Sequence, residues 1–135
     1  MTARDQHSTV WRGPVTDQEL SRLHAAAFAR DQELESWVER LERYSLGWVT
    51  VRSGELLVGF CNIITDGGRH AFLLDVVVDP DHQGTGVGKS LVHRAIEECR
   101  SSSVDWLHVD FEADLGSFSM TEGLFRRSTA GILKV

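Results

Sequence analysis

The apolar residues that follow Thr16 recur with the period of an α-helix. Thr16 and Glu19 have the spacing of a capping box, so we expect a helix to begin near Asp17. Two successive segments then carry an apolar stripe each, formed by Leu20, Leu23, Ala27 and Phe28 and by Leu34, Trp37, Val38 and Leu41. This spacing predicts two amphipathic helices, which come after a short strand at residues 10–12.

The pattern then changes to the period of two that is typical of β-strands. Strands are expected at residues 48–52 and 56–64, joined by a tight turn. Residues 71–78 are apolar except for Asp75 and are rich in valine. Such a run predicts a central strand that is buried on both faces.

Beyond this strand, helix and strand patterns continue to alternate. A helix of about three to four turns is marked by the apolar residues Val87, Leu91, Val92, Ala95, Ile96 and Cys99. We further expect a strand at residues 106–111, a short helix at 115–122 and a last strand at 132–135. The order of elements implies an α/β fold, with helices covering a mixed sheet, in a single domain over residues 1–135.

The composition limits the range of partners. A formal net charge of -6 argues against a nucleic acid, which needs clustered lysine and arginine, and suits a cationic or neutral substrate. Cys61 and Cys99 lie far apart inside apolar runs, so we expect two buried free thiols and no metal site. No stretch approaches the ~18 apolar residues of a membrane span. We therefore expect a cytoplasmic protein without membrane contact.

The segment between the valine-rich strand and the next helix carries three glycines in five residues, Gly84, Gly86 and Gly88. Glycines make a poor helix start unless the backbone must approach something closely. The N–H groups at a helix start attract anions, and a glycine-rich turn adds further donors. A phosphate-bearing ligand is therefore expected at this turn.

Two common phosphate-binding motifs do not fit here. Gly88, Lys89 and Ser90 supply the end of a Walker A motif, but its first glycine falls on Gln83, and only 45 of the 135 residues follow Ser90. In the dinucleotide-binding pattern, the third glycine falls on Lys89.

The segment Gln83-Gly84-Thr85-Gly86-Val87-Gly88 is similar to the signature of the GNAT superfamily of N-acetyltransferases, Q/R-x-x-G-x-G/A. Its context matches too, because a strand ending in Val-Asp-Pro precedes it and a helix follows. The resemblance covers roughly residues 47–135, and the two leading helices also suit the family. It implies a mixed, mostly antiparallel sheet with flanking helices and a central strand pair that a bulge splays apart.

The resemblance also implies that acetyl-CoA is the co-substrate. The backbone of the turn would hold its pyrophosphate, and the preceding strand would pair with its pantetheine arm. The cofactor-binding residues implied in this way are Val76, Val78, Gln83, Gly84, Thr85, Gly86, Val87, Gly88, Lys89 and Phe118.

Members of this family let an amine attack the thioester directly, which requires that an ammonium first loses a proton. Asp75 is the first candidate for the base, because it is the only charge inside an apolar run; a structural Asp bonded to backbone is the alternative. Asp110 follows, with His108 and Glu112 on the same face of the next strand, and then His70. A surface role without catalysis is equally open for these last four residues.

Two positions depart from the family pattern. Ser119 follows Phe118 at the place where members commonly carry a tyrosine that protonates the leaving thiolate. A serine hydroxyl is too weakly acidic to replace that phenol, although it can hydrogen-bond or hold a water. Glu112 stands where many members have an asparagine that contacts the cofactor.

The sequence thus predicts an N-acetyltransferase whose acceptor is a primary amine on a small molecule or a peptide. Ser119 motivates an alternative, which is a catalytically weak or inactive acyl-CoA-binding sensor or interaction module of the same fold. Whether the chain works as a monomer or a homodimer stays open.

Overall fold

The computed structural model of the chain describes residues 7–110 and 123–135. Its elements are β1 (Thr9–Trp11), α1 (Asp17–Ala27), α2 (Trp37–Tyr44), β2 (Ser45–Ser53), β3 (Leu56–Thr65), β4 (His70–Val78), the 3₁₀ turn η2 (Pro80–His82), α3 (Val87–Arg100) and β5 (Trp106–Val109). The strands form one sheet in the order β1-β2-β3-β4-β5. Among the strands of the described residues, only β4 and β5 are parallel neighbours. The expected α/β fold with a mostly antiparallel sheet is confirmed.

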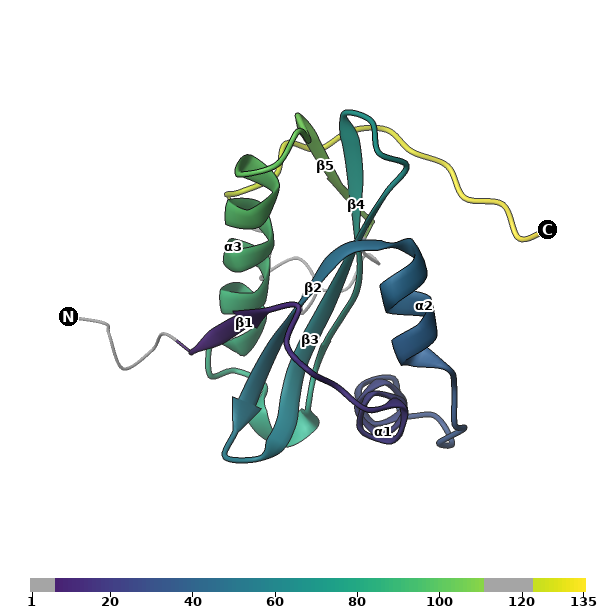
Figure 1. Cartoon of the computed structure of the whole chain (residues 1–135), viewed down its shortest axis with the longest axis vertical. Helices are drawn as coiled ribbons and strands as arrows, with labels where there is room; N and C mark the ends of the chain where they lie inside the picture. Colours follow the sequence, from purple (N-terminus) through teal and green to yellow (C-terminus); the bar gives the residue numbers. More distant parts are fainter. Residues whose placement is uncertain (1–6, 111–122) are drawn as a thin grey trace.

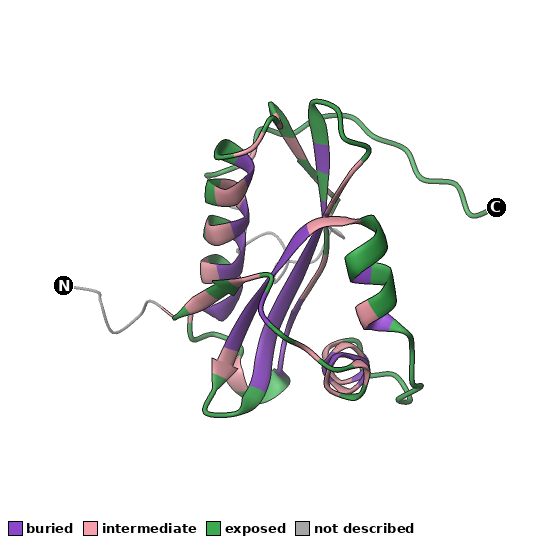
Figure 2. Cartoon of the chain, in the orientation of Figure 1, coloured by how far each residue is buried: buried purple, intermediate pink, exposed green. Residues whose placement is uncertain are grey.

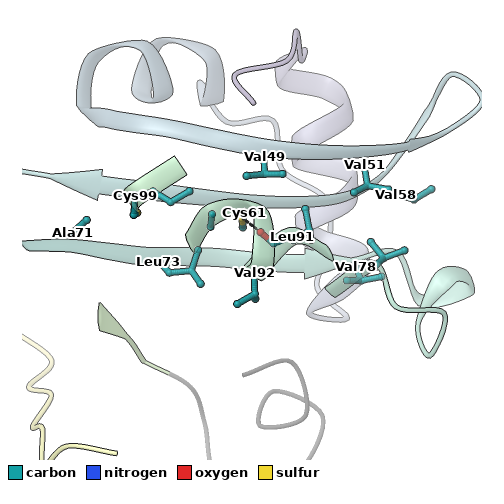
Figure 3. Packing of buried hydrophobic residues seen from close by; sticks show 13 residues of the cluster. Val49, Val51, Val58, Cys61, Ala71, Leu73, Val78, Leu91, Val92 and Cys99 are labelled. Carbon is teal, nitrogen blue, oxygen red and sulfur yellow. Dashed lines mark hydrogen bonds between the residues drawn. The ribbon is translucent and has the colours of Figure 1, made fainter. Parts of the chain in front are cut away.

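Helices cover both faces of the sheet, with α3 on one face and α1 and α2 on the other (Figure 1). The larger core lies under α3, where Leu91 and Val92 pack against strand residues such as Val49 and Leu73 (Figure 3). Cys61 and Cys99 belong to this core as free, buried cysteines, as expected. Buried residues are concentrated in the middle strands and on the inner faces of the helices (Figure 2).

The second core lies under α1 and α2 and consists of Leu20, Leu23, Trp37, Leu41, Trp48, Leu57, Phe60 and Val77. The start of α1 is fixed by the predicted capping box. Thr16 Oγ1 accepts a 3.1 Å hydrogen bond from Glu19 N, and Thr16 N donates to Glu19 Oε2 at 2.9 Å. The helix therefore begins at Asp17, where the sequence predicts it.

The second helix begins later than the apolar stripe suggested. It starts at Trp37, and Leu34 lies outside it with 68% of its surface exposed. Glu35 N donates instead to Ser21 Oγ at 3.0 Å, so the chain before Trp37 follows the surface of α1. A tertiary contact has overridden the helical spacing at this point.

The prediction that β4 is buried on both faces is wrong for its first half. Ala71 and Leu73 are buried under α3, but Phe72 and Leu74 on the other face are 45% and 37% exposed. This half of the strand is exposed because α1 and α2 pack only over its other end, at Val77. An apolar run shows which residues favour a strand but not how far a helix extends over it.

The last strand predicted from the sequence is also absent from the described residues. Residues 131–135 form no strand, and Ile132 and Leu133 are 90% and 81% exposed. The end of the chain runs away from the sheet (Figure 1), so its β-favouring residues have no ladder to join. The predicted helix at 115–122 and the end of the strand predicted at 106–111 lie outside the described residues.

A buried carboxylate anchors the end of β4 to α1. Asp79 accepts hydrogen bonds from Asp81 N at 2.9 Å and from Arg22 Nη1 at 3.2 Å, and Arg22 Nη2 donates to Leu57 O at 2.7 Å. Burial raises the pKa of Asp79, but these hydrogen bonds and the nearby His82 outweigh it, so that the pKa lies below its ordinary value. The charged form of Asp79 therefore stabilises the folded conformation of the segment that leads from β4 into the glycine-rich turn.

No helix in the described ranges is long and apolar enough to cross a membrane. The described residues also contain no group of three or more His, Cys, Asp or Glu side chains arranged to hold a metal ion.

Gly59 in β3 gives a prediction about how α3 sits on the sheet. A Cβ at Gly59 would lie 2.5 Å from Val87 Cγ1, and Val87 is buried at the first position of α3. Gly59→Ala should lower the free energy of unfolding by about 1–3 kcal/mol in urea denaturation, because valine cannot move aside easily. Gly131→Ala, where a Cβ would meet nothing within 4 Å, serves as the control. Equal stability of Gly59→Ala and the wild type would show that α3 can shift without cost.

Asp79 gives a prediction about acid stability. Because the pKa of Asp79 is lowered in the folded state, its charge contributes fully to the free energy of unfolding above the unfolded-state pKa of about 3.9. This contribution is lost as the pH falls through the lower folded-state value. Asp79→Asn should therefore cost about 1–3 kcal/mol at pH 7 and progressively less below pH ~4, measured by urea denaturation. The exposed Asp105, paired with Arg69, provides the control Asp105→Asn with little effect. If the free energies of unfolding of the wild type and Asp79→Asn differ by the same amount down to pH ~2, this role of the charge is contradicted.

Candidate functional site

A bulge in β4 determines where the candidate site lies. Phe60 pairs with Val77 and Asn62 with Leu74, so Asp75 and Val76 together oppose the single residue Cys61. Asp75 has a φ of 53°, in the left-handed region that Asp tolerates better than most residues. The extra residue reverses the faces of the strand, and Leu73 therefore packs under α3 while Val77 packs under α1 and α2. The bulge expected from the family resemblance is confirmed.

The described part of β5 lies beside the half of β4 that precedes the bulge. The two strands pair only from His70 with Trp106 to Leu73 with Val109. Along the rest of β4, from residue 74 to 78, the described chain provides no strand on the β5 side. Val76 and Val78, both predicted to bind the cofactor, lie in this unpaired stretch. The carbonyl of Val78 accepts a 3.4 Å hydrogen bond from Gln83 Nε2, which ties the strand to the turn.

The glycine-rich turn connects η2 to α3 through left-handed backbone. Gly84 and Gly86 have φ values of 78° and 92°, which only glycine adopts readily, and Gly86 is the N-cap of α3. A Cβ at Gly84 would meet nothing within 4 Å, so the turn is open on that side. The first N–H groups of a helix have no partner within it, and the first turn of α3 contains no acidic residue. The turn therefore offers free donors in a local field that favours an anion.

A cavity of about 670 Å³ adjoins this turn. Gly84, Thr85, Gly86 and Lys89 line it together with Thr9 of β1. Because Thr9 takes part, the cavity lies on the β1 side of α3 and is distinct from the gap between β4 and β5 that the family resemblance assigns to the cofactor. The two spaces share the turn, so four of the predicted cofactor-binding residues line an accessible surface.

The N-terminal segment reaches the same turn. His7 Nε2 lies 2.7 Å from Thr85 O, and His7 N lies 3.4 Å from Ser90 Oγ. Thr85 Oγ1 in turn donates to His82 O at 2.6 Å, which closes the turn on itself. These contacts fix the conformation of the turn before any ligand arrives.

Asp75, the first candidate for the base, is neither fully buried nor unpaired. Its Oδ1 lies 3.4 Å from His24 Nε2 of α1, and 30% of its side chain is exposed. Opposite the bulge, burial raises the pKa of the Cys61 thiol, with a smaller contribution from the charge of Asp75. The Cys61 side chain therefore stays a neutral thiol, whereas Asp75 is a partly exposed carboxylate.

Sequence reasoning missed His24. A signal was present, because His24 follows Leu20 by four residues and thus lies on the apolar face of α1, where a lone polar residue needs a partner. The partner is on β4, which no local pattern reveals.

Of the other candidate bases, His70 and His108 lie on the paired part of β4 and β5, before the bulge. His70 Nδ1 and His108 Nε2 are 2.7 Å apart, and the His108 ring stacks on Phe72 with centroids 4.7 Å apart. This face also carries the exposed Trp106, so it is mixed aromatic and histidine where the sequence predicted a polar face. Asp110 is exposed and follows directly after β5. Phe118, Ser119 and Glu112 lie outside the described residues.

Comparison with curated proteins shows related N-acetyltransferases. The chain is 36% identical over 70 residues to the uncharacterized N-acetyltransferase ycf52 of Pyropia yezoensis, a match covering 52% of this chain and 40% of that protein. It is 34% identical over 89 residues to the L-amino acid N-acyltransferase MnaT of Escherichia coli (strain K12), covering 58% of this chain and 51% of that one. The matches thus span about half or less of the length of these relatives.

Solved structures agree on the fold. An acetyltransferase of the GNAT family from Streptococcus pneumoniae TIGR4 superposes with a TM-score of 0.74 at 18% identity, over 95% of this chain and 96% of that one. At this identity, the likeness concerns the fold alone. The model of the acetyltransferase (GNAT) family matches residues 13–120 of the sequence, which is well over half of the chain. The chain therefore belongs to the GNAT family of acetyltransferases.

Proposed function

We propose that this protein transfers the acetyl group of acetyl-CoA to a primary amine by direct attack. The observation that carries the proposal is the left-handed glycine turn at the start of α3, which follows the bulged strand β4 directly. The turn offers backbone donors for the pyrophosphate of acetyl-CoA. The backbone of β4 after the bulge offers hydrogen-bonding groups for the extended pantetheine arm.

The turn suits a pyrophosphate better than a neutral group. Its donors are backbone N–H groups, to which the dipole of α3 and the ammonium of Lys89 add positive potential. Glycine at 84, 86 and 88 removes the Cβ atoms that would keep phosphate oxygens from the backbone. The predicted residues of the turn, from Gln83 to Lys89, therefore form the proposed pyrophosphate site.

The amine must lose a proton before it can attack. An alkylammonium with a pKa near ~10.4 is only about one part in a few thousand neutral at pH 7, which costs roughly 4–5 kcal/mol. In the proposed reaction, Asp75 takes one proton from the ammonium, and the amine nitrogen forms a bond to the carbonyl carbon as the C–S bond breaks. The nitrogen loses its second proton to the thiolate, and Asp75 returns its own proton to water.

The acceptor class follows from the chemistry of the site and from the relatives. A carboxylate at the bulge and a net charge of -6 favour a cationic amine. The relative from Escherichia coli is named as an L-amino acid N-acyltransferase. We therefore propose a primary amine on a small molecule or a peptide. A suitable test panel contains free L-amino acids, a short peptide with a free N-terminus and an aminoglycoside.

A second candidate function is a sensor or interaction module that binds acyl-CoA with little or no catalysis. Ser119 favours it, because serine stands where the family commonly has the tyrosine that protonates the thiolate. The CoA thiol, however, has a pKa near ~8.5 and is a fair leaving group, so losing the phenol would cost only about 10²–10⁴ in rate. Release of free thiol from acetyl-CoA with the amine panel separates the two functions.

Acetyl-CoA should raise the melting temperature, because a ligand that binds only the folded state stabilises it, by about 2.7 kcal/mol at a hundred times its Kd. ATP and NAD should raise it far less. Gly86→Val should abolish the shift, since valine cannot adopt the left-handed N-cap and its side chain would cover the donors. Gly131→Val, in exposed chain far along the sequence, is the control that keeps the shift. An equal shift with ATP would refute the proposed ligand.

Removal of the base should slow thiol release in a pH-dependent way. Asp75→Asn keeps the shape of the side chain but cannot take a proton, so kcat should fall by ~10² or more near pH 7. Part of the loss should return at high pH, where the amine is already neutral. The measurement is a pH–rate profile beside the control Asp105→Asn. A wild-type profile for Asp75→Asn would make Asp75 structural and leave Asp110, His108 or solvent as the acceptor of the proton.

A further inference from the structure

We propose that His24 is the residue that positions Asp75 for proton transfer, an assignment that rests on the proposed transferase function. The structure joins the two side chains across the α1–β4 interface, with His24 Nε2 3.4 Å from Asp75 Oδ1. Asp75 is the more exposed of the pair, with 30% of its side chain accessible against 17% for His24. The carboxylate thus lies toward solvent and the imidazole behind it.

The ring of His24 contacts two aromatic side chains, Phe28 directly after α1 and Trp37 at the start of α2. Its centroid lies 4.7 Å from the ring of Phe28 and 5.2 Å from that of Trp37. Trp37 is itself fixed, because it is 1% exposed and carries the Arg40 guanidinium over its ring at 3.9 Å. Packing on two sides leaves the imidazole few orientations, which makes His24 a rigid donor rather than a mobile surface group.

Asp75 depends on such a donor because the bulge fixes the conformation of its backbone but not the orientation of its carboxylate. The left-handed φ at the bulge determines the direction of the Cα–Cβ bond. The hydrogen bonds among the described residues reach only Oδ1, which leaves Oδ2 to accept a proton. A bond from His24 therefore decides which oxygen is offered to an incoming amine.

The proton balance follows from this division of roles. An N–H bond of the ammonium breaks and an O–H bond forms at Oδ2 of Asp75, while His24 keeps the proton on Nε2 that it donates to Oδ1. The amine nitrogen then bonds to the carbonyl carbon, the C–S bond breaks, and the thiolate receives the second proton from nitrogen. Asp75 finally releases its proton to water, and His24 is unchanged throughout.

The test compares His24→Leu with His24→Gln in thiol release from acetyl-CoA, using the amine of the panel that gives the highest wild-type rate. Leucine retains the apolar packing against Phe28 and Trp37 but cannot donate, so kcat should fall about 10-fold while the KM for acetyl-CoA stays within about twofold. Glutamine can donate from its side-chain amide and should recover most of that loss. Arg100→Leu, at the exposed last position of α3 on the other side of the sheet, is the control and should leave kcat unchanged.

A double-mutant cycle separates positioning from a merely structural role. In the Asp75→Asn background, His24→Leu should cost nothing further in kcat, because no base is left to position. Independently of activity, the ring signals of His24 in the NMR spectrum of the folded protein should shift on Asp75→Asn and stay in place on Asp105→Asn.

Three outcomes would overturn the assignment. They are an unchanged kcat for His24→Leu, an equal fall in kcat in both backgrounds, and ring signals of His24 that do not respond to Asp75→Asn. If the wild type releases no thiol with any amine of the panel although acetyl-CoA raises its melting temperature, the proposed transferase function itself fails. The assignment of His24 then fails with it. Thiol release by the wild type with an unaffected His24→Leu variant refutes the assignment alone.

Discussion

One extra residue in β4 is the constraint on which the rest of the structure depends. Because Asp75 and Val76 share a single partner in β3, the two halves of β4 present opposite faces to α3 and to the α1–α2 layer. A regular strand would put Leu73 and Val77 on the same side, and the second core would lose Val77. The pairing with β5 that the described residues show, from His70 to Leu73, lies entirely before the bulge. The bulge thus shapes both cores and lies beside the proposed cofactor gap.

The charges at the end of β4 extend this constraint to the turn. Asp79 lies four residues beyond the bulge and bonds to Arg22, while His24 on the same helix reaches Asp75. Two contacts from one helix thus hold the chain at Asp75, in the bulge, and at Asp79, just after β4. The glycine-rich turn follows directly, and its position relative to Asp75 is determined by α1 as much as by the strand itself.

Local signals in the sequence were sufficient for most elements. The capping box at Thr16, the glycine-rich turn and the apolar face of α3 each depend on residues a few positions apart, and each was predicted. The wrong predictions concern which residues are covered by another helix or strand. Leu34 and Ile132 have the right character for a helix and a strand, but whether such residues find a partner depends on segments distant in sequence. His24 was missed for the same reason, since its partner lies 51 residues away.

The bulge residue is an aspartate where the backbone conformation favours glycine. A left-handed φ favours glycine, and for a residue with a Cβ it costs up to about 1–2 kcal/mol, somewhat less for Asp. Glycine at residue 75 would thus form the same bulge with less strain and would need no partner for a half-exposed carboxylate. The chain instead places an acid there and a histidine against it, between two aromatic rings. Local strain together with a partner supplied from another element supports the proposed role of Asp75 in proton transfer.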